Sequence, residues 1–387
     1  QLADYQVIKN EPTWQVLAKA YAYRDFCKEI LRKNITNQDE YAIAIAILLG
    51  VKDNLENPIR EAYSAAGAMH VLAVSGLHVG ILFWMTGILL GGLKKKKYGK
   101  WVFMSLVLLV LWSYAMITGL SASVLRAVIM FSFILIIKTF NKNQTSIYNS
   151  LAVSAILLLA YDPYLLMNLG FQLSYIAVLG IVYFTQHWQY WFYPSNQVSK
   201  FLWEAVTVSF AAQIATAPLV MLHFHQLPTY FWLSNLVIGI LAIVILSSGI
   251  ALFMLYWLPY FEEIMGTLLE FFVKVMNTAV FWVESLPFST MQGINISSFE
   301  CVLLYAMLGF LILFFSYRKF NYFVLAFLSI GVFTISFQST IFRQNKQQKV
   351  LVYQVRNELN LCLIEGRNSF LFTDSSLYAT KSSFSYA

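Results

Sequence analysis

Apolar runs of about 18 or more residues recur along most of this chain, and each can cross a hydrocarbon layer of about 30 Å as a helix. Lipid offers no hydrogen-bond partner to a backbone amide, so only helices and closed barrels cross it, and the runs are far too long for barrel strands. The 387 residues are 59% apolar and only 12% charged, whereas soluble proteins are about a quarter charged. The sequence therefore predicts an all-α polytopic membrane protein with about 8–11 transmembrane helices.

The membrane block is predicted to run from residue 68 to 342, between two segments of different character. Residues 1–67 are predicted to form amphipathic or peripheral helices, with a short apolar helix from Asp39 to Val51. Residues 343–387 are more polar and predict a β-rich outer segment, in which LVYQV, LCLIE and SFLFTD form strands between turns. The predicted spans are 68–93, 101–118, 120–138, 147–160, 168–186, 201–223, 231–258, 264–286, 299–316 and 321–341.

Lysine and arginine residues occur in alternate loops of this block. Cytoplasmic loops retain these residues, so the basic loops are predicted inside and both ends of the block outside. The same rule accounts for the formal net charge of +7 without nucleic acid. The basic loops contain Lys94–Lys100, Lys138 with Lys142, Lys200, and Arg318 with Lys319.

The first predicted span contains two histidines and a serine in the stretch HVLAVSGLHVG. On one continuous helix, at about 100° per residue, His70, Ser75 and His78 fall within an arc of about 140°. Histidine in lipid is costly, so this polar stripe either lines a pore or bonds to neighbouring helices. A helix break at Ser75 would abolish the stripe. The glycines on the opposite side predict a close helix–helix seam; they are Gly76, Gly80, Gly87 and Gly91.

Later spans also carry polar residues. Gly119, Ser123 and Ala127 repeat at four-residue spacing, which predicts helix packing, and Arg126 lies several residues inside the same span. A buried arginine needs an anion, carbonyl groups or water, so Arg126 is either a structural partner of a helix end or a contact for phosphate in transit. The further candidates for a polar path are Gln172, Gln213 and Asn235.

The sequence offers little chemistry otherwise. It contains no P-loop, G-x-S-x-G, HExxH or HxHxDH motif. His223 and His225 lack nearby Cys or carboxylate ligands, so no metal is expected. The three cysteines form no CxxC pair, which indicates neither a disulfide framework nor a thiolate metal site. No catalysis and no cofactor are predicted.

Four motifs in order resemble the ComEC competence family: HVLAVSGLHVG, GLSASVLRAVIM, GFQLSYIAVLGI and AAQIATAPLVMLHFHQLPTYFWLSNLVIG. The resemblance covers roughly residues 20–290. It implies a multi-pass protein of the bacterial cytoplasmic membrane that imports one strand of external DNA. It also implies an outer OB-like domain before the channel and an outer metallo-β-lactamase-like domain after it. The implied partners are an outer DNA receptor and a cytoplasmic motor ATPase, and a homo-oligomer is left open.

The chain departs from this family pattern at both ends. The OB-like region is absent or reduced to a tail before residue 20, and the chain starts at Gln1 rather than Met, which predicts a fragment. No β-lactamase metal motif is present, so residues 343–387 are either the opening strands of that domain or a degenerate remnant. The leading hypothesis is a channel for single-stranded DNA. Two alternatives remain: a small-molecule or ion transporter with a relay of His70, His78 and Arg126, or the membrane anchor of a nuclease domain missing from this chain.

Overall fold

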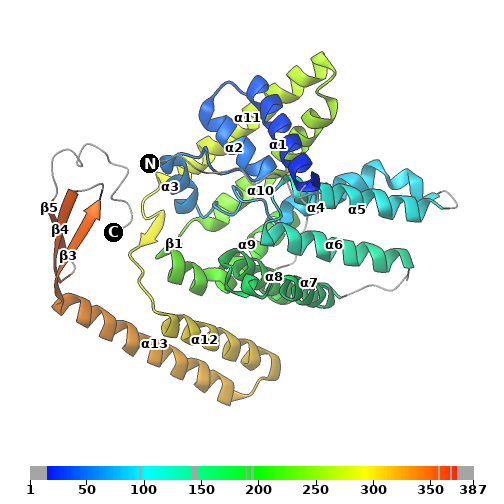
Figure 1. The fold of residues 1–387 in the computed structure, drawn as a ribbon. Helices are drawn as coiled ribbons and strands as arrows, with labels where there is room; N and C mark the ends of the chain where they lie inside the picture. The colour runs from blue at the N-terminus through cyan, green and yellow to red at the C-terminus, as the bar shows by residue number, and fades with distance from the viewer. Residues whose placement is uncertain are drawn as a thin grey trace. The chain divides into compact units, whose positions relative to one another are not determined.

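The computed structural model describes residues 15–95, 98–140, 146–188, 190–192, 196–355, 358–366 and 368–372. The chain divides into two compact units, Gln1–Ile294 and Asn295–Ala387, and each is described by itself (Figure 1). The described part of the first unit contains α1 (Gln15–Asn34), α2 (Gln38–Leu49), α3 (Asn57–Ala65), α4 (Gly76–Leu89), η2 (Gly91–Lys95), α5 (Gly99–Ile117), α6 (Ala122–Phe140), α7 (Ile147–Tyr161), η3 (Pro163–Met167), α8 (Leu169–Trp188), α9 (Gln197–Phe224), β1 (Gln226–Pro228), α10 (Phe231–Leu255), α11 (Pro259–Glu284) and β2 (Thr290–Gln292).

The helices confirm the predicted all-α polytopic fold. Among the described residues, eight helices are long and apolar enough to cross a membrane: α5, α6, α8, α9, α10, α11, and in the second unit α12 (Ser298–Tyr317) and α13 (Phe320–Lys346). α4 and α7 are shorter apolar helices, at 14 and 15 residues. These ten helices correspond in order to the ten predicted spans.

The prediction of one helix from residue 68 to 93 is wrong at its start. α4 begins at Gly76, and Ser75 has extended backbone angles of φ −122° and ψ 176°. The Ser75 hydroxyl accepts the backbone N–H of Leu77, because a serine side chain competes with the helix for local backbone groups and so favours the capping position. His70 therefore does not lie on α4, and the predicted stripe with Ser75 and His78 does not exist.

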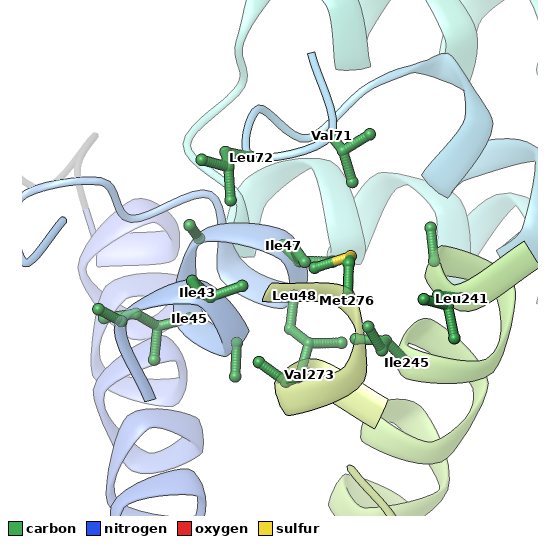
Figure 2. Close-up of a cluster of buried hydrophobic side chains, with 14 of the residues drawn as sticks. Ile43, Ile45, Ile47, Leu48, Val71, Leu72, Leu241, Ile245, Val273 and Met276 are labelled. Carbon is green, nitrogen blue, oxygen red and sulfur yellow. The ribbon is translucent and has the colours of Figure 1, made fainter. Parts of the chain in front are cut away.

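α2 lies in the interior of the first unit. Every residue from Ala42 to Leu49 is at most 2% exposed. Figure 2 shows its isoleucines and Leu48 beside side chains of α10 and α11, with Val71 and Leu72 at the same cluster. The sequence suggested a peripheral position for this stretch. A helix that is apolar on every face is stabilised only when all of its faces are covered, and α1, α10 and α11 cover this one.

Polar contacts attach the end of α1 to α11. Lys33 Nζ lies 2.8 Å from one oxygen of Glu262, and Asn34 Nδ2 donates to the other at 3.0 Å. The backbone N–H of Thr36 donates to Glu270 at 2.9 Å. Both carboxylates belong to α11, so these contacts fix the loop that leads into α2.

A short antiparallel sheet closes one end of the first unit. β1 pairs with β2, and Leu227 lies opposite Met291. The Gln226 side chain donates to the Ser64 hydroxyl at the end of α3. Gly67 has φ +73°, and a Cβ there would lie 3.0 Å from the Pro228 ring. The turn after α3 thus packs directly on the segment that precedes α10.

The second unit combines a helical hairpin with a small sheet. α12 and α13 pack against each other, and Glu300 is fully buried where they meet. Its carboxylate accepts the N–H of Ser297 at 2.7 Å and the hydroxyl of Ser336 at 2.9 Å. β3 (Gln348–Val355), β4 (Glu358–Glu365) and β5 (Asn368–Phe372) form an antiparallel sheet in that order. This confirms the three predicted strands; Arg356, Asn357 and Arg367 of the predicted turns lie outside the described residues.

Candidate functional site

The start of α4 is held by a reciprocal pair of side chains. Ser75 Oγ lies 3.1 Å from His78 Nδ1, and that nitrogen also accepts the backbone N–H of Ser75 at 3.2 Å. This is a capping box with histidine in place of the usual Glu or Gln. His78 is 1% exposed. The interaction fixes the helix start and leaves His78 Nε2 buried without a hydrogen-bond partner among the described residues.

Arg126 lies on α6 in the interior of the same unit, at 6% exposure. Its Nε donates to Ser174 Oγ of α8 at 2.7 Å, and its Nη1 lies 3.5 Å from Met130 Sδ. Within the described ranges no carboxylate lies within ion-pair distance of the guanidinium. The hydrogen-bond partners of this cation among the described residues are thus neutral.

Gly76 is the residue of α4 that meets this guanidinium. A Cβ built on Gly76 would lie 2.7 Å from Arg126 Nη2, which is closer than real side chains approach. The absence of a side chain at Gly76 thus leaves the space that the Arg126 head group occupies. The first turn of α4 and the Arg126 cation are direct neighbours.

Two further polar residues extend this cluster to α7. The Tyr175 ring of α8 lies 5.8 Å from the Arg126 guanidinium carbon, within the range of a cation–π contact. The Tyr175 hydroxyl and Ser154 Oγ of α7 are 2.9 Å apart, and Ser154 also donates to the Leu151 carbonyl at 2.7 Å. Arg126 of α6 thus bonds to α8 and lies against Gly76 of α4, and Tyr175 links α8 to α7. We call Ser75, Gly76, His78, Arg126 and Ser174 the α4–α6 cluster.

The other predicted path residues have other hydrogen-bond surroundings. His70 is exposed, and its Nδ1 lies 3.1 Å from the Gly67 carbonyl oxygen. Gln172 is on α8 and donates to the Leu166 carbonyl at 2.8 Å. Gln213 of α9 and Asn235 of α10 each have a buried polar atom to which no residue of the described ranges is hydrogen-bonded. The structure thus places Ser75 and His78 together at the start of α4, whose Gly76 meets Arg126.

The residues predicted for helix packing have different surroundings. A Cβ on Gly80 would meet Phe131 of α6 at an ordinary 3.5 Å. Gly119 lies in the turn between α5 and α6 with φ +84°, a conformation that favours glycine. Ser123 Oγ donates to the Gly170 carbonyl of α8 at 3.4 Å. For Gly87 and Gly91 no atom of the described residues lies within 4 Å of an added Cβ, so the described part of the chain gives no close helix contact at these two positions.

Sequence reasoning missed Tyr175 and Ser154 as members of this network. Tyr175 lies in the motif GFQLSYIAVLGI, but a tyrosine there is indistinguishable from the many aromatics that face lipid or core. Ser154 has no sequence signal, because isolated serines are common in apolar helices. Among the described residues, no group of three or more His, Cys, Asp or Glu is arranged to hold a metal.

Comparisons with known proteins agree on one family. Residues 47–318, more than half of the chain, match the model of the family described as Competence protein. ComE operon protein 3 of Bacillus subtilis is 34% identical over 206 residues, which are 51% of this chain and 25% of that protein. An uncharacterized protein of Aquifex aeolicus is 31% identical over 202 residues, 51% of this chain and 44% of that protein. The chain thus matches less than half the length of these relatives. No solved structure matches it.

Proposed function

The chain belongs to the competence protein family, and we propose that its first unit forms a conduit for single-stranded DNA across the bacterial cytoplasmic membrane. The family match and the candidate membrane spans support a part in DNA uptake by a multi-pass membrane protein. By the same resemblance, the partners would be an outer DNA receptor and a cytoplasmic motor ATPase.

The observation that carries the proposal is a break in the helical chain within the first unit. The segment 66–75 between α3 and α4 is not helical, although Ala66, Ala68 and Leu72 are fully buried. In membrane proteins, irregular backbone among spans is tolerated where protein buries it or where it lines a cavity, and broken helices of transporters form substrate sites this way. The break leads directly into the α4–α6 cluster. A substrate path beside this break therefore has a physical basis.

The conformation described is a closed one at this point. His78 is 1% exposed and Arg126 is 6% exposed, so a polymer reaches them only after neighbouring helices separate. In this proposal α8 moves relative to α6, which breaks the hydrogen bonds of Ser174 and Gly170 with α6 and separates the apolar side chains packed between the two helices. Opening at α8 would expose Arg126 to a passing phosphate.

We assign no bond-breaking step to this chain. In the proposed scheme the strand arrives already single, and a separate protein or domain degrades its complement. The energy for transport comes from the motor on the inner side, since the chain has no nucleotide-binding motif. The chain would supply the route and the selectivity.

The test compares substrates in one system. The full chain is expressed in a transformable strain whose own competence channel gene is deleted, and uptake of labelled single-stranded DNA and of labelled small anions is measured. We expect DNA uptake to be restored and small-anion uptake to stay at the level of the empty vector. Restored anion uptake without DNA uptake would favour a small-anion transporter instead. An Arg24→Gln variant, which removes a cation from α1 of the same unit, controls for the general effect of losing one charge.

A further inference from the structure

We propose that four lysines at one end of α4, α5 and α6 form a docking surface for the headgroups of anionic phospholipids. We call Lys94, Lys95, Lys100 and Lys138 the lysine patch, and all four side chains are exposed. The inference concerns the lipid around the protein, so it does not rest on the proposed DNA conduit.

The lysine patch has no countercharge in the chain around it. No Asp or Glu occurs between Glu61 and Asp162, a stretch that includes all of α4, α5 and α6. Among the described residues, no carboxylate lies within ion-pair distance of the patch, whereas Lys28, Lys33 and Lys200 each have one. Like charges gathered in one place repel each other, so anions from outside the chain would stabilise the patch.

Packing places two of these lysines on one side of α5. A Cβ on Gly99 would overlap the Leu93 carbonyl, so η2 folds directly onto the start of α5. Lys94 Nζ lies 4.0 Å from the centre of the Phe103 ring on α5, which is a cation–π contact. Phe103 is three residues after Lys100, and residues three apart are neighbours on a helix surface. Lys94 and Lys100 therefore belong to the same side of this helix start.

An aromatic contact places Lys138 at the same end. Trp101 of α5 meets Phe140 of α6 edge-on, with ring centres 4.8 Å apart, and Lys138 lies in the last turn of α6. The first turn of α5 and the last turn of α6 are thus adjacent, and their lysines share one end of the helix pair. Three further lysines of the same two loops lie outside the described residues; they are Lys96, Lys97 and Lys142.

The surroundings of the patch fit a bilayer surface. α5 and α6 are both long and apolar enough to cross a membrane, so the ends that carry the lysines lie at its headgroup layer. Tyr98 and Trp101 are 69% and 45% exposed at this end, and Tyr and Trp are typical of that layer. Clusters of about four to eight basic residues beside a membrane helix attract anionic lipid. Because lysine-rich loops stay inside, the lipid would be that of the inner leaflet.

A nucleic-acid strand fits this surface less well than lipid does. Proteins that bind single strands without sequence preference stack the bases on aromatic faces. Here Lys94 covers the ring of Phe103, and Trp101 packs against Phe140. The patch thus offers charge without the stacking faces that bases require.

The experiment measures lipid binding to the purified full chain. The chain in detergent is titrated with phosphatidylglycerol or with phosphatidylcholine, and native mass spectrometry gives the affinity of each lipid. We expect the wild type to prefer phosphatidylglycerol. The double variant Lys95→Gln with Lys100→Gln should bind phosphatidylglycerol more weakly, by about fivefold for each lysine removed.

Two further double variants are the controls. Lys95→Arg with Lys100→Arg keeps the charge and should keep the wild-type affinity for phosphatidylglycerol. Lys28→Gln with Lys200→Gln removes two lysines that already have a carboxylate partner, so the affinity should also stay unchanged. The unfolding temperature of each variant is measured alongside.

Each outcome bears on the inference. Weaker phosphatidylglycerol binding in the Lys95 and Lys100 glutamine variant alone supports the docking surface. Unchanged binding at the wild-type unfolding temperature overturns it, and so does an equal loss in the Lys28 and Lys200 variant. A fluorescent oligo-dT that loses affinity in the glutamine variant, while lipid binding stays the same, overturns the lipid assignment in favour of nucleic acid. If that variant does not fold, Lys138→Gln decides, because lipid binding unchanged by this substitution also overturns the inference.

Discussion

Replacing Gly76 with alanine tests the α4–α6 cluster through a single methyl group. The new Cβ would lie 2.7 Å from Arg126 Nη2, whereas ordinary contact begins at 3.4 Å, so the head group must move by about 0.7 Å. The movement would stretch the 2.7 Å bond from Nε to Ser174 Oγ beyond its normal range of about 2.7–3.2 Å. A hydrogen bond to a charged group contributes about 1.5–3 kcal/mol.

The effect on folding is smaller than the effect on the site. Alanine is favoured over glycine in a helix by about 0.5–1 kcal/mol, which offsets part of the lost bond. We expect the free energy of unfolding to fall by about 1–2 kcal/mol and the protein level to stay close to wild type. Transformation frequency should fall by about tenfold or more, because Arg126 no longer faces the helix start.

Gly80→Ala is the matched control on the same helix. Its Cβ would meet Phe131 at 3.5 Å, an ordinary contact, so both stability and transformation should stay at wild-type values. The assay is transformation frequency normalised to protein level, with thermal unfolding measured in detergent. Normal transformation by Gly76→Ala, or equal damage by Gly80→Ala, would refute the argument that Gly76 accommodates Arg126. Equal damage would instead support a glycine seam along α4.

Three other predictions follow from different parts of the chain. The Ser123 hydroxyl and the Gly170 carbonyl oxygen are 3.4 Å apart, so a short bifunctional thiol linker can join cysteines placed at these positions by Ser123→Cys and Gly170→Cys. This linker should block DNA uptake, and reduction of a reducible linker should restore it. Unchanged uptake would show that α6 and α8 need not separate. A thiol reagent applied from outside should label a cysteine at position 375 and not one at position 96, because basic loops stay inside; the reverse pattern would overturn the topology. Glu300→Ala should lower the unfolding free energy of the α12–α13 hairpin by about 1–3 kcal/mol, since two donors lose their acceptor. Glu300→Gln should lower the unfolding free energy by less. Equal stability of the wild type and both variants would contradict this role of Glu300.

The order of the membrane helices was predictable because lipid leaves the backbone few alternatives. α5 and α12 begin and end within two residues of the predicted spans, since long apolar runs bounded by polar loops define their own ends. The break before α4 was not decided by the sequence. Ser75 fits either inside a helix or at its cap, and the choice depends on His78 bonding back to Ser75.

Residues that act through tertiary contacts were the hardest to predict. The interior position of α2 cannot be predicted from its sequence, because an apolar run of 12 residues is too short to span lipid. For Arg126 the sequence indicated an interior position but not its partner. Carboxylates were the natural candidates by charge, whereas the structure provides the Ser174 hydroxyl. Which helix faces Arg126 depends on the packing of α6 against α8, and no periodicity in either helix encodes that choice.

A buried arginine with neutral partners contributes little to the stability of a fold. Burial of a cation costs several kcal/mol, and well-packed apolar residues of similar volume often stabilise a protein more than buried charges do. In the first unit this cost is placed where a helix begins, beside Gly76. Packing alone does not explain this cost, whereas a phosphate passing the break on the proposed path would offset it.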